Sequence, residues 1–271
     1  MFDKTAFAGH ESVHHFFDAK TGLRAIIAIH STVRGPAGGG CRMWNYATAD
    51  EALVDALRLS EGMSYKNAMA DLPLGGGKAV IWGNSKTGKT PEMFRALGRA
   101  IESLNGKYWS AEDVGVSVTD MAYAAEETKY VAGLSTGKAA SGDPSPVTAK
   151  GVFLGIKACA QRAFGADDLN GKHVAVQGVG HVGGYVCKHL AEAGAKLTIA
   201  DVNQDTLDSV AKATGAKIVA PEEIYDVAAD VFSPNALGAI INPNTIGRIR
   251  ARVIAGGANN QLSTPDMGDR L

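Results

Sequence analysis

A glycine-rich turn between two apolar stretches places the strongest limit on how the second half of this chain can fold. The turn, Gly178-Val179-Gly180-His181-Val182-Gly183, follows a predicted strand at 173–177 and opens a predicted helix at 182–193. A further predicted strand at 196–200 completes a strand–helix–strand unit. In such a unit the first glycine permits a tight turn, the second admits a pyrophosphate, and the third lets the helix pack on the strand. The sequence therefore predicts a dinucleotide-binding domain built on a parallel sheet.

The residue after the second strand indicates which dinucleotide is bound. Asp201 stands where a carboxylate can accept hydrogen bonds from a ribose diol. A 2′-phosphate at the same place would meet a like charge. We therefore predict NAD rather than NADP as the cofactor. The alternative interpretation is a glycine turn that binds no ligand.

A lysine in a glycine-rich setting is the most informative feature of the first half. Lys78 ends the run Leu72-Pro73-Leu74-Gly75-Gly76-Gly77-Lys78 and precedes an apolar stretch, 79–82, that is predicted to be a buried strand. Backbone without side chains can pack closely around this lysine, and loss of water lowers the pKa of an ammonium. Free lysine has a pKa of about 10.4, so a lysine base near neutral pH requires such a shift. With Lys66 and Asp113 on either side in the sequence, the pattern suggests an amino-acid dehydrogenase.

The bulk composition excludes several classes of function. The 271 residues suffice for two modest domains, and 27 basic against 28 acidic side chains leave no basic surface for nucleic acid. The three cysteines, Cys41, Cys159 and Cys187, are widely spaced and form no CxxC pair, which fits a reducing cytosol. No signal peptide is predicted, and no uncharged apolar run approaches about 18 residues. We expect a cytoplasmic globular protein that binds neither nucleic acid nor membrane.

Alternating strand and helix patterns predict an α/β protein in which parallel sheets are covered by helices in both halves. Predicted strands outside the glycine-turn unit cover 24–30, 79–82, 231–232 and 253–255. Predicted helices begin at Thr48 with capping-box spacing, at Thr90-Pro91, at Ser117 or Thr119, at Val147 and at Thr206. The glycine- and serine-rich piece from Gly133 to Pro146 is interpreted as a hinge. We place a substrate and oligomerisation domain at 1–140 and the dinucleotide-binding domain at 141–271.

Two further pattern matches are interpreted as accidental. Residues 83–90 fit the phosphate-loop pattern, yet Thr90-Pro91 already serves as an ordinary helix start, and no separate strand supplies a carboxylate for magnesium. A polar surface turn is favoured there, with a P-loop nucleoside-triphosphatase as the alternative. Residues 10–14 fit HExxH, but no third ligand follows at a suitable spacing. A half-exposed strand is favoured, and no metal site is predicted.

Taken together, the motifs resemble the glutamate/leucine/phenylalanine/valine dehydrogenase family over nearly the entire chain. The matching segments are Gly35–Met43 (GPAGGGCRM), Lys66, Gly75–Lys78 (GGGK), Ala111–Gly115 (AEDVG), Gly142–Thr148, the glycine turn and Gly256–Gln261 (GGANNQ). The AEDVG segment is most similar to the leucine dehydrogenase branch. The resemblance implies an N-terminal α/β substrate domain, then a Rossmann-type doubly wound domain, with a cleft between them that closes on amino acid and cofactor. It also implies a homo-oligomer.

The same resemblance implies a role for individual residues. Lys78 would be the acid/base group that activates water, Asp113 would shuttle a proton at the amine, and Lys66 would bind the substrate carboxylate. Asn259 would hold the substrate and approach the nicotinamide, with Asn260 as the alternative if the register is off by one. The substrate pocket would include Gly38 and Gly39. The expected NAD contacts are Thr148, Gly178, Gly180, Val182, Gly183, Asp201, Ala236, Leu237 and Asn259.

The implied reaction is NAD-dependent oxidative deamination of an apolar L-amino acid of the leucine, valine or phenylalanine class. Gly38 stands where the leucine-specific pattern carries a bulkier residue, so we expect an enlarged pocket that admits phenylalanine. Family members continue past Asn259-Asn260-Gln261 with helices that return to the substrate domain, whereas this chain ends at Leu271. We therefore expect some uncovered apolar surface and loosely controlled closure. An NAD-binding protein without turnover is the alternative.

Overall fold

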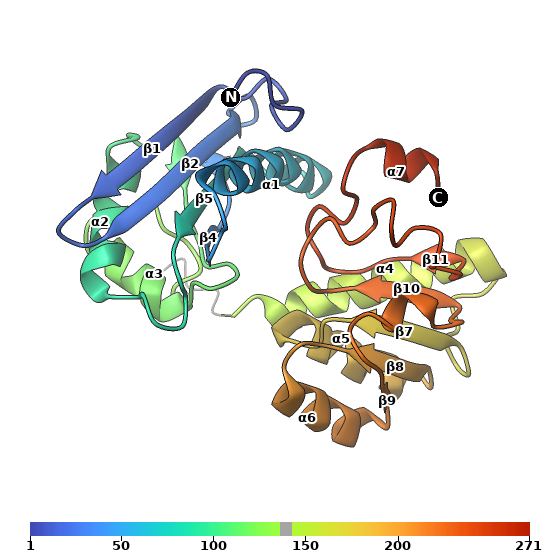
Figure 1. Cartoon of the computed structure of the whole chain (residues 1–271). Coiled ribbons are helices and arrows are strands. Elements are labelled where there is room, and N and C mark those ends of the chain that lie inside the picture. The colour runs from blue at the N-terminus through green and yellow to red at the C-terminus, as the bar shows by residue number, and fades with distance from the viewer. Residues whose placement is uncertain (136–142) are drawn as a thin grey trace. The chain divides into compact units, whose positions relative to one another are not determined.

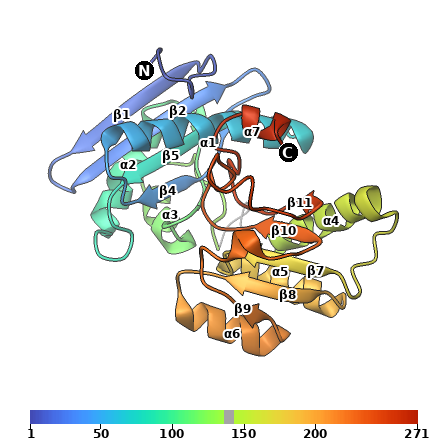
Figure 2. The ribbon, with the colours of Figure 1, turned by 45° about the vertical axis from the view of Figure 1, so that its right-hand side comes forward.

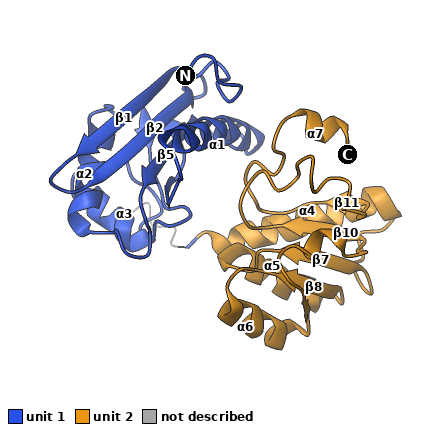
Figure 3. Ribbon diagram, viewed as in Figure 1, with its two compact units in different colours: residues 1–143 blue, residues 144–271 orange. Residues whose placement is uncertain are grey.

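Two separate sheets, each with its own core, organise the part of the chain that the computed structural model describes, residues 1–135 and 143–271 (Figure 1). Unit 1 is Met1–Asp143 and unit 2 is Pro144–Leu271 (Figure 3). The domain boundary predicted between residues 140 and 141 lies outside the described residues, as does the middle of the predicted hinge. Within the described ranges, no helix combines the length and the apolar character that a membrane span requires.

Unit 1 is built on a mixed sheet with the strand order β1-β2-β5-β3-β6, in which β4 also pairs with β5. The strands are β1 (Ser12–Asp18), β2 (Leu23–Ser31), β3 (Ala37–Gly38), β4 (Cys41–Trp44), β5 (Gly75–Trp82) and β6 (Tyr108–Trp109). Strand β2 runs antiparallel to both of its neighbours, β1 and β5, whereas β3 and β4 run parallel to β5. The prediction of a parallel sheet is therefore wrong for this unit. The cause is the short turn at 19–22, which can only form a hairpin, since parallel strands need a long crossover.

Strand β2 shows how alternating side chains build a core on each face of this sheet. Its odd-numbered residues, from Leu23 to Ile29, pack with α2 (Pro91–Glu102) and α3 (Val118–Ala125). Its even-numbered Ile26 and Ala28 pack with α1 (Ala49–Met69), which lies along the sheet in Figure 2. Successive strand residues point to opposite faces, and each fully buried aliphatic side chain contributes about 1.5–3 kcal/mol.

The helix starts in unit 1 confirm the sequence predictions. Thr48, Thr90 and Ser117 each accept a hydrogen bond from a backbone N–H three residues later, at 3.1, 3.2 and 3.2 Å. Such side-chain caps satisfy donors that the first helical turn leaves unpaired. The third helix, α3, nevertheless ends at Ala125, earlier than the predicted end near Tyr130.

Unit 2 is a wholly parallel sheet with the strand order β11-β10-β7-β8-β9. The strands are β7 (His173–Gln177), β8 (Lys196–Ala200), β9 (Lys217–Ile218), β10 (Val231–Pro234) and β11 (Val253–Ile254). Three helices, α4 (Ser145–Phe164), α5 (His181–Glu192) and α6 (Gln204–Thr214), lie side by side on one face. The other face packs on a short 3₁₀ helix, Ile224–Asp226, and nearby loops. A last short helix, α7, consists of Asp266–Asp269. This doubly wound order confirms the predicted dinucleotide-binding fold.

Candidate functional site

Two glycine runs let separate backbone segments pack closely in unit 1. In the sheet, Gly38 lies beside Gly76, and the following residues run parallel to β5. A Cβ atom on Gly39 would overlap the carbonyl oxygen of Gly77, and one on Gly76 would overlap Ser64 of α1. Both positions therefore require glycine. The packing leaves the lysine that follows these glycines on β5 only 3% exposed.

That lysine, Lys78, forms an ion pair with the predicted carboxylate. Its Nζ donates to Oδ2 of Asp113 at 2.5 Å. The loop after β6 carries Asp113 and is held beside β4 by backbone bonds, one of them from Cys41 N–H to the Ala111 carbonyl. Burial alone would raise the pKa of the Asp113 carboxyl, but the charges of Lys78 and Arg42 outweigh burial and hold that pKa well below its usual range. Asp113 is therefore a carboxylate at neutral pH.

Lys66 reaches the same cluster from the last turn of α1. Partial burial of its ammonium, and next the positive charge of Lys78, lower the pKa of Lys66, while Asp113 acts in the opposite direction. Lys78 and Arg42 contact Asp113, and Lys66 adds a third positive charge to the cluster; this positive charge can attract an anionic ligand such as a carboxylate.

A buried arginine and two partners complete the cluster, and the sequence analysis gave them no role. Arg42 of β4 is 7% exposed, and its Nε donates to Oδ2 of Asp113 at 3.3 Å. Its Nη1 donates to Oδ2 of Asp55 at 3.0 Å, and the Tyr46 hydroxyl donates to the same oxygen at 2.5 Å. The signal that could have found this arginine is a charge inside a buried apolar strand, where charged side chains are rarely found unless paired.

In unit 2 the glycine turn has the geometry that its spacing predicts. Gly178 adopts a φ of 84°, and a Cβ on Gly183 would overlap the carbonyl oxygen of Gly178. By contrast, a Cβ on Gly180 would find no atom of the described residues within 4 Å. Gly180 is also the N-cap of α5, and within residues 1–135 and 143–271 no side chain caps that helix. An open space beside an uncapped helix N-terminus suits a pyrophosphate.

Asp201 is held beside this turn at the carboxyl end of β8. Its Oδ2 accepts the Val179 N–H at 2.8 Å, and its Oδ1 accepts the Asn203 N–H at 2.9 Å. An ionised carboxylate offers about four lone-pair sites, so each oxygen can accept a further hydrogen bond. The carboxylate thus has the position and the acceptor capacity that a ribose diol requires.

The remaining predicted residues of unit 2 lie in different surroundings. Ala236 lies directly against Gly178, and a Cβ on Gly257 would contact Val182 at 3.3 Å. Thr148, in the first turn of α4, and Leu237 are exposed. Asn259 and Asn260 belong to a loop whose carbonyl oxygens face Gly238. Lys66, Lys78, Asp113, Gly38 and Gly39 all belong to unit 1, whereas Asn259 and all of the predicted cofactor residues belong to unit 2.

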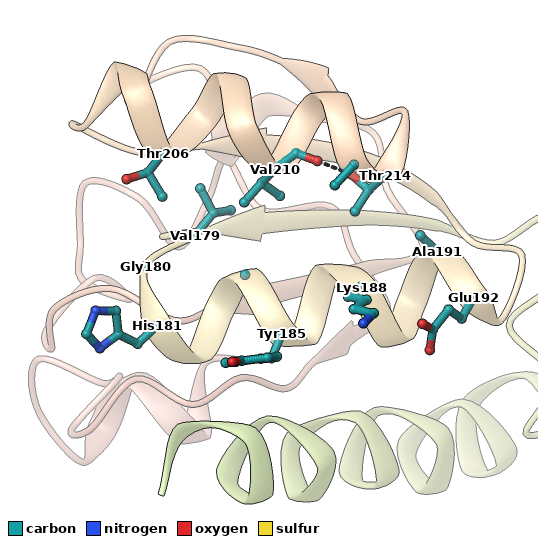
Figure 4. A pocket seen from close by; sticks show the side chains of 12 residues that line it. Val179, Gly180, His181, Tyr185, Lys188, Ala191, Glu192, Thr206, Val210 and Thr214 are labelled. Atoms are coloured by element: carbon teal, nitrogen blue, oxygen red, sulfur yellow. Dashed lines mark hydrogen bonds between the residues drawn. The ribbon is translucent and has the colours of Figure 1, made fainter. Parts of the chain in front are cut away.

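A pocket of about 560 Å³ lies between α5 and α6 (Figure 4). Side chains from both helices line it, including Tyr185 and Lys188 of α5 and Val210 of α6. Gly180 is the single predicted cofactor residue in its wall. The pocket follows the helix faces, whereas doubly wound folds hold ligands at the carboxyl ends of the strands. We therefore do not assign the dinucleotide to it.

The two pattern matches that were interpreted as accidental have structural partners. Lys89 of the phosphate-loop match donates to Asp120 at 2.5 Å, and Thr90 caps α2. In the HExxH match, the buried ring of His10 has Nε2 3.0 Å from the Leu57 carbonyl, and His14 lies on β1, which confirms the predicted strand. Among residues 1–135 and 143–271, no group of three or more metal-binding side chains is found.

Comparisons with known proteins agree with this geometry. A family model described as Glu/Leu/Phe/Val dehydrogenase, dimerisation domain, matches residues 10–130, and the Glutamate/Leucine/Phenylalanine/Valine dehydrogenase model matches 141–203. The chain is 54% identical to a leucine dehydrogenase of Thermoactinomyces intermedius, covering all of this chain and 74% of that protein. It is 46% identical to a phenylalanine dehydrogenase of Bacillus thermotolerans, with 100% and 72% covered. The crystal structure of L-tryptophan dehydrogenase from Nostoc punctiforme matches with a TM-score of 0.69 and 43% identity, over 94% of this chain and 72% of that one.

A fold shared with enzymes of this kind, at such identity, defines the class: the protein is an amino-acid dehydrogenase, an oxidoreductase. Within that class, the chain belongs to the Glu/Leu/Phe/Val dehydrogenase family. The predicted family and the predicted order of a substrate domain before a Rossmann-type domain are thereby confirmed.

Proposed function

We propose that the protein catalyses NAD-dependent oxidative deamination of an apolar L-amino acid to the 2-oxo acid and ammonia. The observation that carries the proposal is the ion pair between Asp113 and Lys78, a lysine that is only 3% exposed. Strongly similar relatives are named leucine, phenylalanine and L-tryptophan dehydrogenases, and these three amino acids all have apolar or aromatic side chains.

In this mechanism the residues of unit 1 bind the substrate and move protons. Lys66 binds the substrate carboxylate through its ammonium. Loss of hydride from the α-carbon leaves an iminium, and water attacks that carbon while Lys78 takes the proton from the water. Asp113, a carboxylate 2.5 Å from Lys78, receives that proton from Lys78 and passes it to the amine, which leaves as ammonia. Gly38 and Gly39 line the space for the substrate side chain.

The residues of unit 2 fit a dinucleotide. The open space at Gly180 and the first turn of α5 would hold the pyrophosphate, and Asp201 would accept hydrogen bonds from a ribose. Thr148, Val182, Ala236, Leu237 and Asn259 would supply the remaining contacts. Bound NAD would accept the hydride. The negative charge of Asp201 disfavours a 2′-phosphate, so we propose NAD rather than NADP.

A spectrophotometric screen of NAD reduction against a panel of L-amino acids tests this function. We expect turnover with aliphatic and aromatic amino acids, little with aspartate or glutamate, and little with NADP in place of NAD. In the reverse direction, branched or aromatic 2-oxo acids should oxidise NADH only when ammonia is present. NAD binding without turnover in either direction would contradict the proposed reaction.

We also propose that the protein is a homo-oligomer assembled through unit 1 and that it is cytoplasmic. The family model that matches residues 10–130 is described as a dimerisation domain. Cys41, Cys159 and Cys187 are all free thiols, as expected in a reducing compartment. Light scattering during gel filtration measures the mass of the assembly, and a monomer at micromolar concentration would contradict the first statement.

The side chain at position 38 is expected to set the preference between phenylalanine and leucine. A Cβ on Gly38 would lie 3.3 Å from the flexible end of Leu74 and 3.5 Å from the Asn67 amide, so a side chain fits there only if Leu74 shifts slightly. A Cβ on Gly39 or Gly40 would instead overlap a backbone oxygen. Burial of a phenylalanine ring contributes about 1.5–3 kcal/mol. Gly38→Leu should therefore lower the ratio of kcat/KM for phenylalanine over leucine by roughly 10–100-fold, and Gly38→Ala by less. A strong preference for leucine in the unmodified enzyme would refute the enlarged pocket.

A further inference from the structure

We propose that Arg42 is a positioning residue: it shares the Asp113 carboxylate with Lys78 and thereby sets how readily Lys78 releases its proton. Asp55 in turn sets how much of the Arg42 charge reaches Asp113. The inference rests on the proposed acid/base role of Lys78. It concerns side chains that do not contact the substrate in that mechanism.

Lys78 and Arg42 bind the same oxygen of Asp113. Oδ2 of Asp113 accepts from Lys78 Nζ at 2.5 Å and from Arg42 Nε at 3.3 Å. A carboxylate that interacts with the guanidinium has less negative potential to offer the ammonium, and the two positive charges also repel each other. Arg42 therefore weakens the attraction between Asp113 and the Lys78 ammonium, which helps Lys78 to release its proton.

Arg42 is itself held between two carboxylates. Its Nη1 donates to Oδ2 and Oδ1 of Asp55 at 3.0 and 3.3 Å, while its Nε faces Asp113. The rigid guanidinium fork allows these separate contacts from one side chain. Asp55 therefore competes with Asp113 for the same guanidinium. The position of Arg42 is thus a balance between the two acids.

Asp55 is fixed in turn by a tyrosine. The Tyr46 hydroxyl donates to its Oδ2 at 2.5 Å, and Trp82 Nε1 donates to the Tyr46 carbonyl at 2.8 Å. Burial, and next the charge of Asp55, raise the pKa of Tyr46, so the phenol remains a proton donor. Tyr46, Asp55, Arg42 and Asp113 therefore form one connected chain that ends at Lys78.

Other titratable groups face the cluster from each neighbouring element. Burial raises the pKa of the Cys41 thiol on β4 to about 12, and burial also raises the pKa of Tyr108 on β6. Lys89 and Asp120 are paired with each other. Lys66 on α1 also interacts with Lys78 and Asp113, so its effect on the pH profile needs its own control.

The test is the pH dependence of kcat/KM in two variants with opposite expected shifts. In Arg42→Met the Asp113 carboxylate interacts with the ammonium of Lys78 alone. The fall of kcat/KM at low pH, called the acid limb, should therefore move to higher pH by about one unit, a tenfold change in proton affinity. Asp55→Asn frees Arg42 to interact more strongly with Asp113, so the acid limb should move to lower pH. Structural damage alone lowers activity without shifting the limb in opposite directions.

Three controls accompany the two variants. Lys89→Met removes another lysine–carboxylate pair of the same unit, with Nζ 2.5 Å from Asp120, and should lower Tm without moving the limb. Arg42→Lys keeps the positive charge without the fork and should shift the limb less than Arg42→Met. The acid limb of the kcat/KM profile should still be present in Lys66→Arg, because the new guanidinium does not lose its proton.

An acid limb that stays in place in both Arg42→Met and Asp55→Asn would overturn the inference, as would shifts of the same sign. If Arg42→Met does not fold, Asp55→Asn and Arg42→Lys decide the question by the same criterion. Failure of the proposed function looks different, because Lys78→Ala would then retain turnover. If Lys78→Ala is inactive and the acid limb stays in place in both Arg42→Met and Asp55→Asn, only the role of Arg42 is refuted.

Discussion

Lys78→Ala is expected to lower kcat for oxidative deamination by about 10²–10⁴-fold, the usual contribution of a positioned acid/base group. The methyl group cannot accept a proton from water, and the next group in the chain, Asp113, is a carboxylate and so a much weaker base than a lysine amine. KM should change less, because Lys66 still binds the substrate carboxylate. Steady-state NADH formation across several amino acids measures both constants.

Two further substitutions decide why activity is lost. Lys78→Arg keeps a positive charge beside Asp113 but cannot act as a base at neutral pH, so it should be nearly as inactive as the alanine variant. Lys89→Ala removes a lysine with the same 2.5 Å separation from a carboxylate, outside the cluster, and should retain turnover. An active Lys78→Arg would assign Lys78 an electrostatic role only, and a Lys78→Ala enzyme within tenfold of the original would refute the assignment altogether.

Local signals in the sequence predicted much of the secondary structure, because they act over a few residues. Each of the caps Thr48, Thr90 and Ser117 bonds within its own first turn. The antiparallel pairing of β1, β2 and β5 was missed, since alternation along one strand does not specify the direction of its neighbour. The strands β3 and β6 have two residues each, too few for any periodicity to be read.

The candidate site was predictable where its residues stand in unusual local settings. Glycines before Lys78 mark a close approach of backbones, and overlaps at Gly39 and Gly76 supply the physical reason. The chain from Tyr46 to Asp113 could not be derived in this way. Arg42 contacts residues 13 and 71 positions away, so only the sheet pairing and the placement of α1 bring them together.

Gly183→Ala is expected to lower both the stability and the NAD affinity of unit 2, whereas Gly180→Ala is expected to lower the NAD affinity alone. The new methyl group of Gly183→Ala would overlap the Gly178 carbonyl oxygen, so α5 must move away from the turn. Such overpacking costs about 3 kcal/mol at the upper end of its usual range, and Tm should fall by roughly 10 °C. NAD affinity should fall as well, because the helix N-terminus and the turn no longer share their geometry.

Gly180→Ala should leave Tm nearly unchanged, because its methyl group enters space that no protein atom occupies within 4 Å. If the pyrophosphate binds in that space, the affinity for NAD should fall at least tenfold, about 1.4 kcal/mol. Gly151→Ala is the matched control, since a Cβ there also finds no atom within 4 Å, but the position lies in the middle of α4. It should raise helix stability by about 0.5–1 kcal/mol and leave NAD affinity as it was. Calorimetric titration with NAD and thermal unfolding separate the three variants, and unchanged NAD affinity in Gly180→Ala would show that the pyrophosphate lies elsewhere.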